Sequence, residues 1–278
     1  MKLRRVLVVF ALVPLVSGFF FESLLAPKAE LWPRWQAHQA NSTGTIDHGA
    51  WNDILGRYVA VGGDGINRVA YGKVAPTDHK ALAAYIDGLA EVAINTFNKA
   101  EQKAYWINLY NALTIRIVLD HYPVDSIRDI DIADGLLADG PWQKKLLTIE
   151  GEAVSLDDIE HRILRPIWRN ARLHYALNCG AVGCPNLETK AFTAANTEDL
   201  LNAAARAYVN HVRGVDARPE WLLVSSIYVW FEDDFGGSAD GVLQHLKKYA
   251  QPDLARRLDG HREINNHAYD WALNAAGS

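Results

Sequence analysis

The stretch RLHYALNCGAVGCPNL, residues 172–187, concentrates the reactive side chains of this chain and organises the interpretation of its fold. It holds both cysteines, Cys179 and Cys184, within one short connection. In its first half, large apolar residues recur at every second position, which is the period of a β-strand. Because both faces of such a strand would be fairly apolar, we expect residues 172–179 to form an interior strand.

The second half of the stretch predicts a turn followed by a helix. Gly180 and Gly183 can adopt positive φ angles at little cost, which suits a tight turn. Pro185 restricts the preceding residue to extended conformations and is favoured at the first position of a helix. Cys184 is therefore expected at a helix N-terminus, where backbone N–H groups and the helix dipole would lower the pKa of its thiol.

Three kinds of site fit the two cysteines. Cys179 and Cys184 can form a disulfide that closes a small loop, or one of them can be a nucleophile with His174 or another histidine as its base. Cysteines and histidines can also bind a metal, but here four residues separate the cysteines and no second pair follows. Metal sites of this kind commonly use a spacing of two, so a metal site is the least favoured alternative.

The composition is that of a globular protein. Hydrophobic residues make up 49% of the 278 positions, charged residues make up 22%, and the net charge is −5. A chain of this length can bury a sizeable core. Nucleic-acid binding depends on basic patches, and the sequence contains no run of Lys or Arg, so no nucleic-acid partner is expected.

Residues 1–26 are typical of an export signal or a membrane anchor. Lys2, Arg4 and Arg5 precede an apolar run over residues 6–21, which matches the basic and hydrophobic regions of a signal peptide. We therefore expect an exported protein, periplasmic or secreted, that contacts a membrane only through this segment if the segment is not cleaved. In an oxidising compartment nearby thiols tend to pair, which favours the disulfide.

The rest of the chain is expected to form one α+β domain. Residues 27–45 are interpreted as a linker or arm, and residues 46–275 as a single globular domain in which several helices pack around a small mixed or antiparallel sheet. Residues 172–179 are expected to be the central strand of this sheet. Periodicity and capping residues predict helices at 80–94, 99–120, 155–168, 196–212 and 239–250, and strands at 58–61, 68–71, 146–149, 152–154, 221–225 and 227–231.

The predicted helix at 99–120 is apolar on all sides, which indicates a central and buried helix. Asn108 and Asn111 lie within it. Because a buried amide needs hydrogen-bond partners, we expect these two side chains to hold a loop or a site in place.

The predicted helix at 155–168 places a carboxylate among apolar residues. On a helical wheel Glu160 falls inside the apolar stripe, where an unpaired charge is costly. Glu160 is therefore expected either to meet a cation such as Arg165 or Arg172, or to orient a histidine at a site. His161 points away from the stripe, which suits a solvated position or a supporting role.

Two segments near the C-terminus are expected to be structural. The acidic residues 232–234 are interpreted as a solvated turn rather than as a cation site. Residues 269–274, YDWALN, are expected to attach the C-terminus to the body, with Asp270 in a supporting role. His267, close to Asp270 in the sequence, is a second candidate base.

Several motifs in this order resemble those of the domain of unknown function 547 (DUF547) family. The resemblance covers residues 51–274, and it departs from the family pattern at residues 180–183 and at Asn186, which replaces a common second proline. The motifs are AYWINLYNALTI at 104–115, HYPVDSI at 121–127, SLDDIEHRILRP at 155–166, HYALNCGAVGCPNL at 174–187, SSIYVWFEDDF at 225–235 and YDWALN at 269–274.

The residues shared with this family are chemically suited to a thiol enzyme. In this first hypothesis the protein is a cysteine-dependent hydrolase or acyl transferase that acts on a peptide, an ester or another envelope component. Cys184, or less favourably Cys179, would be the nucleophile, His174 its base and Glu160 the group that orients His174. Asn178 or loop N–H groups would stabilise an oxyanion.

The second hypothesis is a non-catalytic binding or scaffold domain. Cys179 and Cys184 would then form a structural disulfide, and Glu160, His174 and Arg165 would form a buried polar network that fixes the packing. Neither hypothesis requires a cofactor or a metal.

Overall fold

The computed structural model describes residues 26–133 and 140–277. The expected signal or anchor segment therefore lies outside the described residues, apart from its last position. Within the described ranges, no helix is long and apolar enough to cross a membrane.

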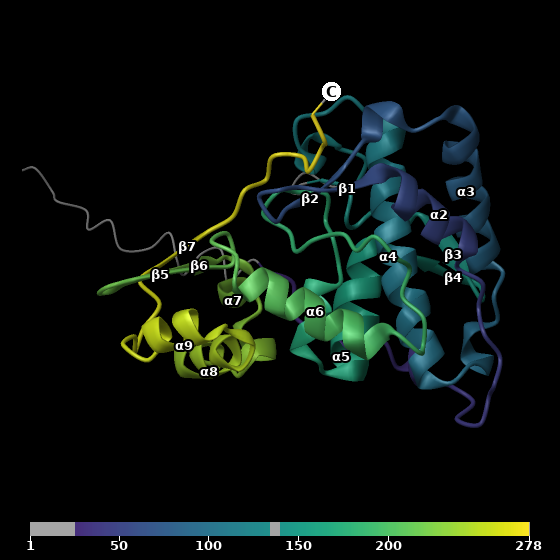
Figure 1. The fold of residues 1–278 in the computed structure, drawn as a ribbon. Helices are drawn as coiled ribbons and strands as arrows, with labels where there is room; N and C mark the ends of the chain where they lie inside the picture. The colour runs from purple at the N-terminus through teal and green to yellow at the C-terminus, as the bar shows by residue number, and fades with distance from the viewer. Residues whose placement is uncertain (1–25, 134–139, 278) are drawn as a thin grey trace, which may run out of the picture.

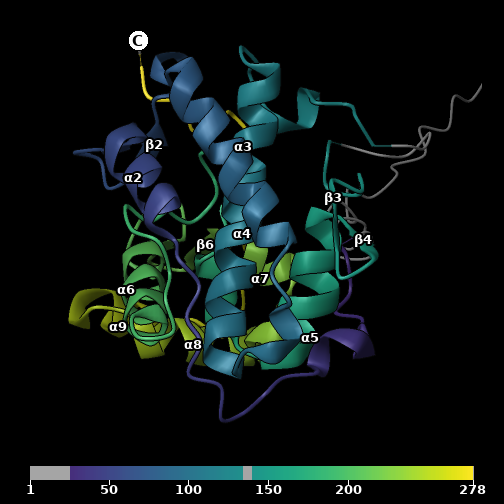
Figure 2. The ribbon, with the colours of Figure 1, turned by 90° about the vertical axis from the view of Figure 1, so that its right-hand side faces the viewer.

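The long helix α4 (Lys99–His121) runs through the centre of the molecule (Figures 1 and 2), and the prediction for this helix is confirmed. Its N-terminus is capped by Asn98, whose side chain accepts hydrogen bonds from the next turn. Most of its residues are buried on every side. Helix α3 (Pro76–Ala90) packs along α4, and α2 (Gly49–Tyr58) packs against α3.

Within residues 26–133 and 140–277 the strands form three small separate sheets, so the α+β class is confirmed, but the expectation of a single central sheet is wrong. Helix α4 occupies the position expected for the sheet because its apolar residues can be buried on all sides. The antiparallel hairpins are β1 (Val59–Val61) with β2 (Asn67–Val69) and β3 (Leu147–Ile149) with β4 (Glu152–Val154). The third sheet has the order β5 (Val215–Arg218), β6 (Trp221–Ser225), β7 (Asn266–Ala268), antiparallel and then parallel.

The strand predicted at residues 172–179 is wrong. Ala171–Tyr175 forms the short 3-10 helix η6, whose first turn is capped by Asn170. The alternation in the sequence has another cause, because Leu173 and Tyr175 are buried in two different hydrophobic clusters. The first cluster surrounds α4 and the second lies between β5, β6 and the C-terminal helices.

Two further predictions near this stretch are corrected. No helix follows Cys184, because the chain after it is irregular up to α6 (Thr197–Val209). Residues 227–231 form the helix α7 (Ile227–Trp230) and not a strand. Their β-branched and aromatic side chains favour a strand, but Val229 and Trp230 donate helical backbone hydrogen bonds to the carbonyl of Ser226. Ile227 and Tyr228 are buried in the second hydrophobic cluster, so tertiary packing overrides the local preference.

The remaining helices surround the second cluster and complete the body. Helix α8 (Ala239–Tyr249) agrees with the prediction, and α9 (Pro252–Leu258) packs against it. The other short 3-10 elements are η1 (Pro33–Gln36), η2 (Tyr71–Lys73), η3 (Ile94–Thr96), η4 (Ile127–Asp129) and η7 (Glu232–Phe235).

The segment interpreted as a linker or arm is packed onto the body. The Trp35 ring is 1% exposed and meets the Trp106 ring of α4 edge-on at 5.1 Å between centroids. The backbone N–H groups of Glu30 and Trp32 donate to the carbonyls of His161 and Arg162. The arm therefore lies along the element that carries Glu160.

Candidate functional site

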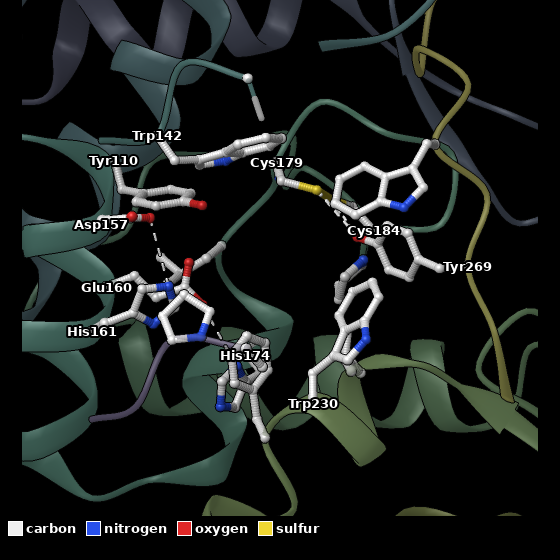
Figure 3. A pocket seen from close by; sticks show the side chains of 18 of the residues that line it. Tyr110, Trp142, Asp157, Glu160, His161, His174, Cys179, Cys184, Trp230 and Tyr269 are labelled. Carbon is white, nitrogen blue, oxygen red and sulfur yellow. Dashed lines mark hydrogen bonds and ion pairs between the residues drawn. A yellow bond between two sulfur atoms is a disulfide. The ribbon is translucent and has the colours of Figure 1, made fainter. Parts of the chain in front are cut away.

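A cavity of about 610 Å³ opens where several segments that are distant in the sequence meet. Figure 3 shows carboxylates and histidines on one side of this cavity and the two cysteines, Tyr269 and Trp230 on the other. Its lining residues are Ala26, Pro27, Tyr110, Arg128, Gly140, Trp142, Gln143, Asp157, Glu160, His161, His174, Leu177, Cys179, Cys184, Pro185, Ile227, Trp230, Phe231, Tyr269 and Trp271.

The acidic side of the cavity is carried by η5 (Asp158–Leu164), a π-helical segment that continues into α5 (Arg165–Trp168). Its N-terminus is fixed by Ser155 and Asp158, whose side chains exchange hydrogen bonds with each other's backbone N–H groups as the sequence predicts. The N–H of Arg165 donates to the carbonyl of Glu160, five residues earlier. Segments of this kind are frequent at functional sites.

The π-helical turn changes where His161 points. A wheel drawn with the ordinary helical period places His161 away from the apolar stripe, but the wider turn brings it to the cavity beside Glu160. Its side chain is buried, so of the two alternatives expected for it the solvated position is wrong and the supporting role remains. The Nδ1 atom of His161 lies 2.9 Å from Nη1 of Arg165 and, when unprotonated, can accept a hydrogen bond from this guanidinium group.

His174 is held between two carboxylates. Its Nε2 lies 2.7 Å from Oδ2 of Asp234, and its Nδ1 faces Oε1 of Glu160 at 3.7 Å. The imidazole stacks on the Phe231 ring at 4.5 Å between centroids. Burial lowers the pKa of His174, although the hydrogen bond to Asp234 opposes this effect, so the neutral ring is favoured at neutral pH.

Asp234 was expected on a solvated turn, and this expectation is wrong. Its Oδ2 accepts hydrogen bonds from both His174 and Nε of Arg165, the latter at 2.6 Å. Burial would raise the pKa of Asp234, but these hydrogen bonds and the Arg165 charge outweigh it and lower the pKa to about 2. Asp234 is therefore an ionised anchor that fixes the positions of His174 and Arg165.

Of the two alternatives for Glu160, proximity to a histidine agrees with the structure. Arg165 makes its ion pair with Asp234, and it also donates to the carbonyl of Pro27. Arg172 lies elsewhere and pairs with Glu198 at 2.6 Å. Glu160 thus faces His174, and it makes no direct ion pair with an arginine in the part of the chain that the structure describes.

Two carboxyl groups in the cavity have raised pKa values. Burial raises the pKa of Glu160 to about 7, although the charge of Arg165 and a hydrogen bond with Tyr110 oppose this rise. Burial and the neighbouring charge of Asp158 raise the pKa of Asp157 to about 6. Both groups can therefore exchange protons near neutral pH, which is the property required of a general acid or base.

Cys179 and Cys184 form a disulfide with 6.2 Å between their Cα atoms. The Tyr269 hydroxyl donates to Sγ of Cys184 at 3.0 Å and lies 3.1 Å from Sγ of Cys179. The N–H of Cys179 also donates to Sγ of Cys184, at 2.9 Å. The ring nitrogens of His174 face carboxylates, so the expected pairing of His174 with a cysteine is not formed in this state of the protein.

Asn178 was expected to stabilise an oxyanion, but its amide is engaged within the loop. Its Nδ2 donates to the carbonyl of Pro185 at 2.7 Å, and its Oδ1 accepts from the N–H of Gly180. Asn178 also does not line the cavity. Its role in this structure is therefore to shape the loop between the cysteines.

The buried amides of α4 hold two loops, as the sequence predicts. Nδ2 of Asn111 donates to the carbonyl of Ala176, and its Oδ1 accepts from the N–H of Asn178. Asn108 makes the same pair of hydrogen bonds to the backbone of Phe192. Helix α4 thus fixes the backbone of the segment that precedes Cys179.

The C-terminal segment supports the same loop. The carbonyl of Asp270 accepts from the N–H of Gly183 at 2.8 Å, and Val182 and Ala272 pair in the same way. This segment runs back across the molecule from β7 (Figure 1), and it attaches to the body as expected. His267, the second candidate base, lies outside the cavity lining, and its Nδ1 lies 2.8 Å from Oγ of Ser226.

Aromatic rings form the wall on the cysteine side. The Tyr269 ring packs against the rings of Trp230 and Trp271 at 4.9 and 4.7 Å between centroids, and Trp142 meets Trp271 edge-on. This wall can pack against an apolar or planar part of a ligand, while the opposite side supplies groups that exchange protons.

Tyr269, Asp157 and Tyr110 line the cavity although the sequence does not predict it, and Asp234 binds Arg165 and His174 where a solvated turn is expected. Tyr269 and Asp234 both lie in motifs that support the family resemblance, YDWALN and SSIYVWFEDDF. The polar and aromatic residues inside these motifs could therefore have been predicted as candidate site residues. Among the described residues, no group of three or more His, Cys, Asp or Glu side chains is arranged to hold a metal ion.

Comparison with known proteins supports the resemblance read from the motifs. Residues 94–209 match the family model described as "Protein of unknown function, DUF547", so the resemblance seen in the motifs is confirmed over this range. The matched range contains α4, η5 and both cysteines. Neither the comparison with curated proteins nor the comparison with solved structures gives a match.

Proposed function

We propose that this protein is an exported protein of the bacterial envelope and a thiol-dependent hydrolase or acyl transferase whose active site is the cavity described above. The proposal of export rests on the basic and apolar residues of the N-terminal segment. The disulfide is consistent with an oxidising compartment.

One observation carries the proposal of catalysis. The same cavity is lined by both cysteines, by His174 and by Glu160, although these residues come from different elements. Figure 3 places the cysteines opposite the carboxylates across the open space. A substrate bound between the two sides would contact a sulfur on one side and a group that can supply a proton on the other.

The roles that we propose for these residues differ from those expected from the sequence. After reduction of the disulfide, the thiolate of Cys184 would be stabilised by the Tyr269 hydroxyl and the Cys179 N–H, which already point at its sulfur. Glu160 replaces His174 as the group that handles the proton, because its pKa lies near neutrality. His174, Asp234 and Arg165 position the acidic side.

The reaction then follows from these positions. The Cys184 thiolate adds to a carbonyl carbon of a peptide or ester, the bond to the leaving nitrogen or oxygen breaks, and protonated Glu160 gives its proton to the leaving atom. Water, or the amine or hydroxyl group of an acceptor, then attacks the carbonyl carbon of the acyl-cysteine and gives a proton to the Glu160 carboxylate. The carbon–sulfur bond breaks, which releases the Cys184 thiolate and restores protonated Glu160. Water as the second reactant gives a hydrolase, and an acceptor gives an acyl transferase.

The experiment is turnover of a panel of activated esters and short peptides by the protein after reduction with a phosphine. We expect activity after reduction that is lost in Cys184→Ala and falls at least about 100-fold in Glu160→Gln. The exposed residue Glu198 provides the matched control, and Glu198→Gln should retain full activity. Equal turnover by the Cys184→Ala variant and the unsubstituted protein would overturn the proposal.

A non-catalytic binding domain is the second candidate, and the network of Arg165, Asp234 and His174 favours it. This network is satisfied internally, as a structural network would be. In this case the reduced protein would turn over no member of the panel, and Asp234→Asn would lower stability without any effect on a reaction. Binding of envelope fragments by the unreduced protein would then be the property to measure.

A further inference from the structure

We propose that the Cys179–Cys184 disulfide undergoes thiol–disulfide exchange with small aliphatic thiols that enter the cavity, with Cys179 as the sulfur that is attacked and Cys184 as the leaving thiolate. This activity concerns the disulfide itself and does not depend on the hydrolase or transferase activity proposed above.

The position of the disulfide makes it accessible from the cavity. Both sulfur-bearing residues line a space of about 610 Å³, which is large enough for a small thiol. The two cysteines differ in exposure, because Cys184 is 1% exposed while Cys179 is partly exposed. An entering thiolate therefore reaches the sulfur of Cys179 first.

The hydrogen bonds around the sulfurs favour the same direction. The N–H of Cys179 donates to Sγ of Cys184 and thereby distinguishes the two sulfurs, while the Tyr269 hydroxyl can serve whichever sulfur becomes charged. Burial raises the pKa of Tyr269 well above its usual value, so the phenol keeps the proton that it donates. Two donors on one sulfur lower the basicity of that thiolate, and a less basic thiolate leaves faster.

The backbone of the loop is held independently of the disulfide. The carbonyl of Gly183 accepts from the Tyr208 hydroxyl at 2.7 Å, and the carbonyl of Val182 accepts from Nη1 of Arg213 at 2.8 Å. The N–H groups of the same two residues are bound by the C-terminal segment. Cleavage of the sulfur–sulfur bond should therefore leave the Cys184 thiolate beside its two donors.

The reaction balances with two thiols of the same class. The first thiolate, R–S⁻, attacks Sγ of Cys179, the bond between the cysteines breaks, and its electron pair leaves on Cys184. This step gives a mixed disulfide between R and Cys179. A second R–S⁻ attacks the sulfur of R in that mixed disulfide, releases R–S–S–R and leaves two reduced cysteines, so the thiols supply two electrons.

The test uses the full chain, purified without reductant and kept under native conditions, with a small excess of reduced glutathione. Samples are quenched with N-ethylmaleimide, and the labelled peptides are mapped by mass spectrometry. We expect glutathione on Cys179 and maleimide on Cys184 in the first intermediate. Glutathione mainly on Cys184, or no adduct until the protein is unfolded with urea, would overturn the proposal.

The variant Tyr269→Phe tests the leaving-group argument separately. Loss of the hydroxyl should slow formation of the mixed disulfide by about three- to tenfold, because one of the two donors to the leaving thiolate is removed. Tyr122, which is partly exposed and does not line the cavity, supplies the control variant Tyr122→Phe, with an unchanged rate expected. An unchanged rate in folded Tyr269→Phe would contradict the assignment of its hydroxyl. If that variant does not fold, the adduct position in the unsubstituted chain decides the proposal alone.

Failure of the exchange can be distinguished from failure of the proposed hydrolysis. The mapping detects a change in sulfur bonding without any acyl substrate. Turnover of esters or peptides is measured after complete reduction with a phosphine, which does not require exchange with a thiol. Each result can therefore be obtained without the other.

Discussion

His174 and Asp234, which lie 60 positions apart in the sequence, are joined by a hydrogen bond of 2.7 Å between Nε2 and Oδ2. The same carboxylate oxygen accepts from Arg165 on α5. One residue of η7 therefore connects the 3-10 helix η6 to the helix that carries Glu160. This connection fixes the acidic side of the cavity.

Asp234→Asn should destabilise the protein, because it leaves the buried guanidinium of Arg165 without its anionic partner. Removal of one partner of a buried ion pair costs roughly 3–5 kcal/mol, and the partial exposure of Asp234 reduces the expected loss to about 2–3 kcal/mol. Denaturant unfolding at neutral pH measures this change. Asp233→Asn on the exposed neighbouring residue is the control, and equal stabilities of the two variants would contradict the prediction.

Glu160 should make stability depend on pH in the direction opposite to an ordinary ion-paired carboxylate. Burial raises its pKa from 4.5 to about 7, so the native state binds the proton more tightly than the unfolded chain. The resulting stabilisation is fully present below about pH 4.5 and is lost as the pH rises through 7. Relative to Glu160→Gln, the free energy of unfolding of the unsubstituted protein should fall by at most about 3 kcal/mol over this range.

Denaturant unfolding at several pH values between about 4.5 and 8 checks this slope. Glu91→Gln on an exposed residue is the matched control and should run parallel to the unsubstituted protein. If the Glu160→Gln curve were also parallel, the native and unfolded states would bind the proton of Glu160 equally, and its proposed role in proton transfer would lose its basis.

The sequence predicts long elements well because their patterns extend over many residues. Helix α4 is 23 residues long, which is more than six turns, and apolar residues recur along its whole length. Both hairpins are indicated by the turn residues between their strands. The stretch at 172–179 is different. Its apparent period of two arises from Leu173 and Tyr175, which are buried in separate clusters, so only the tertiary structure reveals that the residues are helical.

The candidate site could be predicted in part for a similar reason. The sequence predicts a specific partner for Glu160, because a carboxylate within an apolar stripe is costly unless it is paired or hydrogen-bonded. The position of His161 depends on the period itself, and nothing local in the sequence marked the π-helical turn. The local sequence indicates a solvated position for Asp234, because its partners Arg165 and His174 are distant in the sequence and meet it only in the folded protein.

Asn111→Ala should destabilise the protein because Asn111 binds the backbone of the segment that precedes Cys179. The substitution leaves the carbonyl of Ala176 and the N–H of Asn178 buried without their partner. Each unsatisfied buried group costs roughly 1–3 kcal/mol, so a loss of about 2–6 kcal/mol in the free energy of unfolding is expected for the two groups together. Asn202→Ala on the exposed side of α6 is the control and should cost less than about 1 kcal/mol; a similar loss in both variants would contradict the role assigned to Asn111.

Reduction of the disulfide should lower stability only modestly and leave the fold intact. The bond joins residues five positions apart, and closure of so short a loop is worth about 2 kcal/mol in the unfolded-chain model. Tyr208 and Arg213 continue to hold the loop backbone after reduction. Unfolding of the double variant Cys179→Ala/Cys184→Ala, compared with the oxidised protein, measures the loss. A collapse of the cooperative transition in this variant would show that the disulfide is required for folding, whereas a small loss with an intact transition would leave the bond free to break and re-form in the native protein.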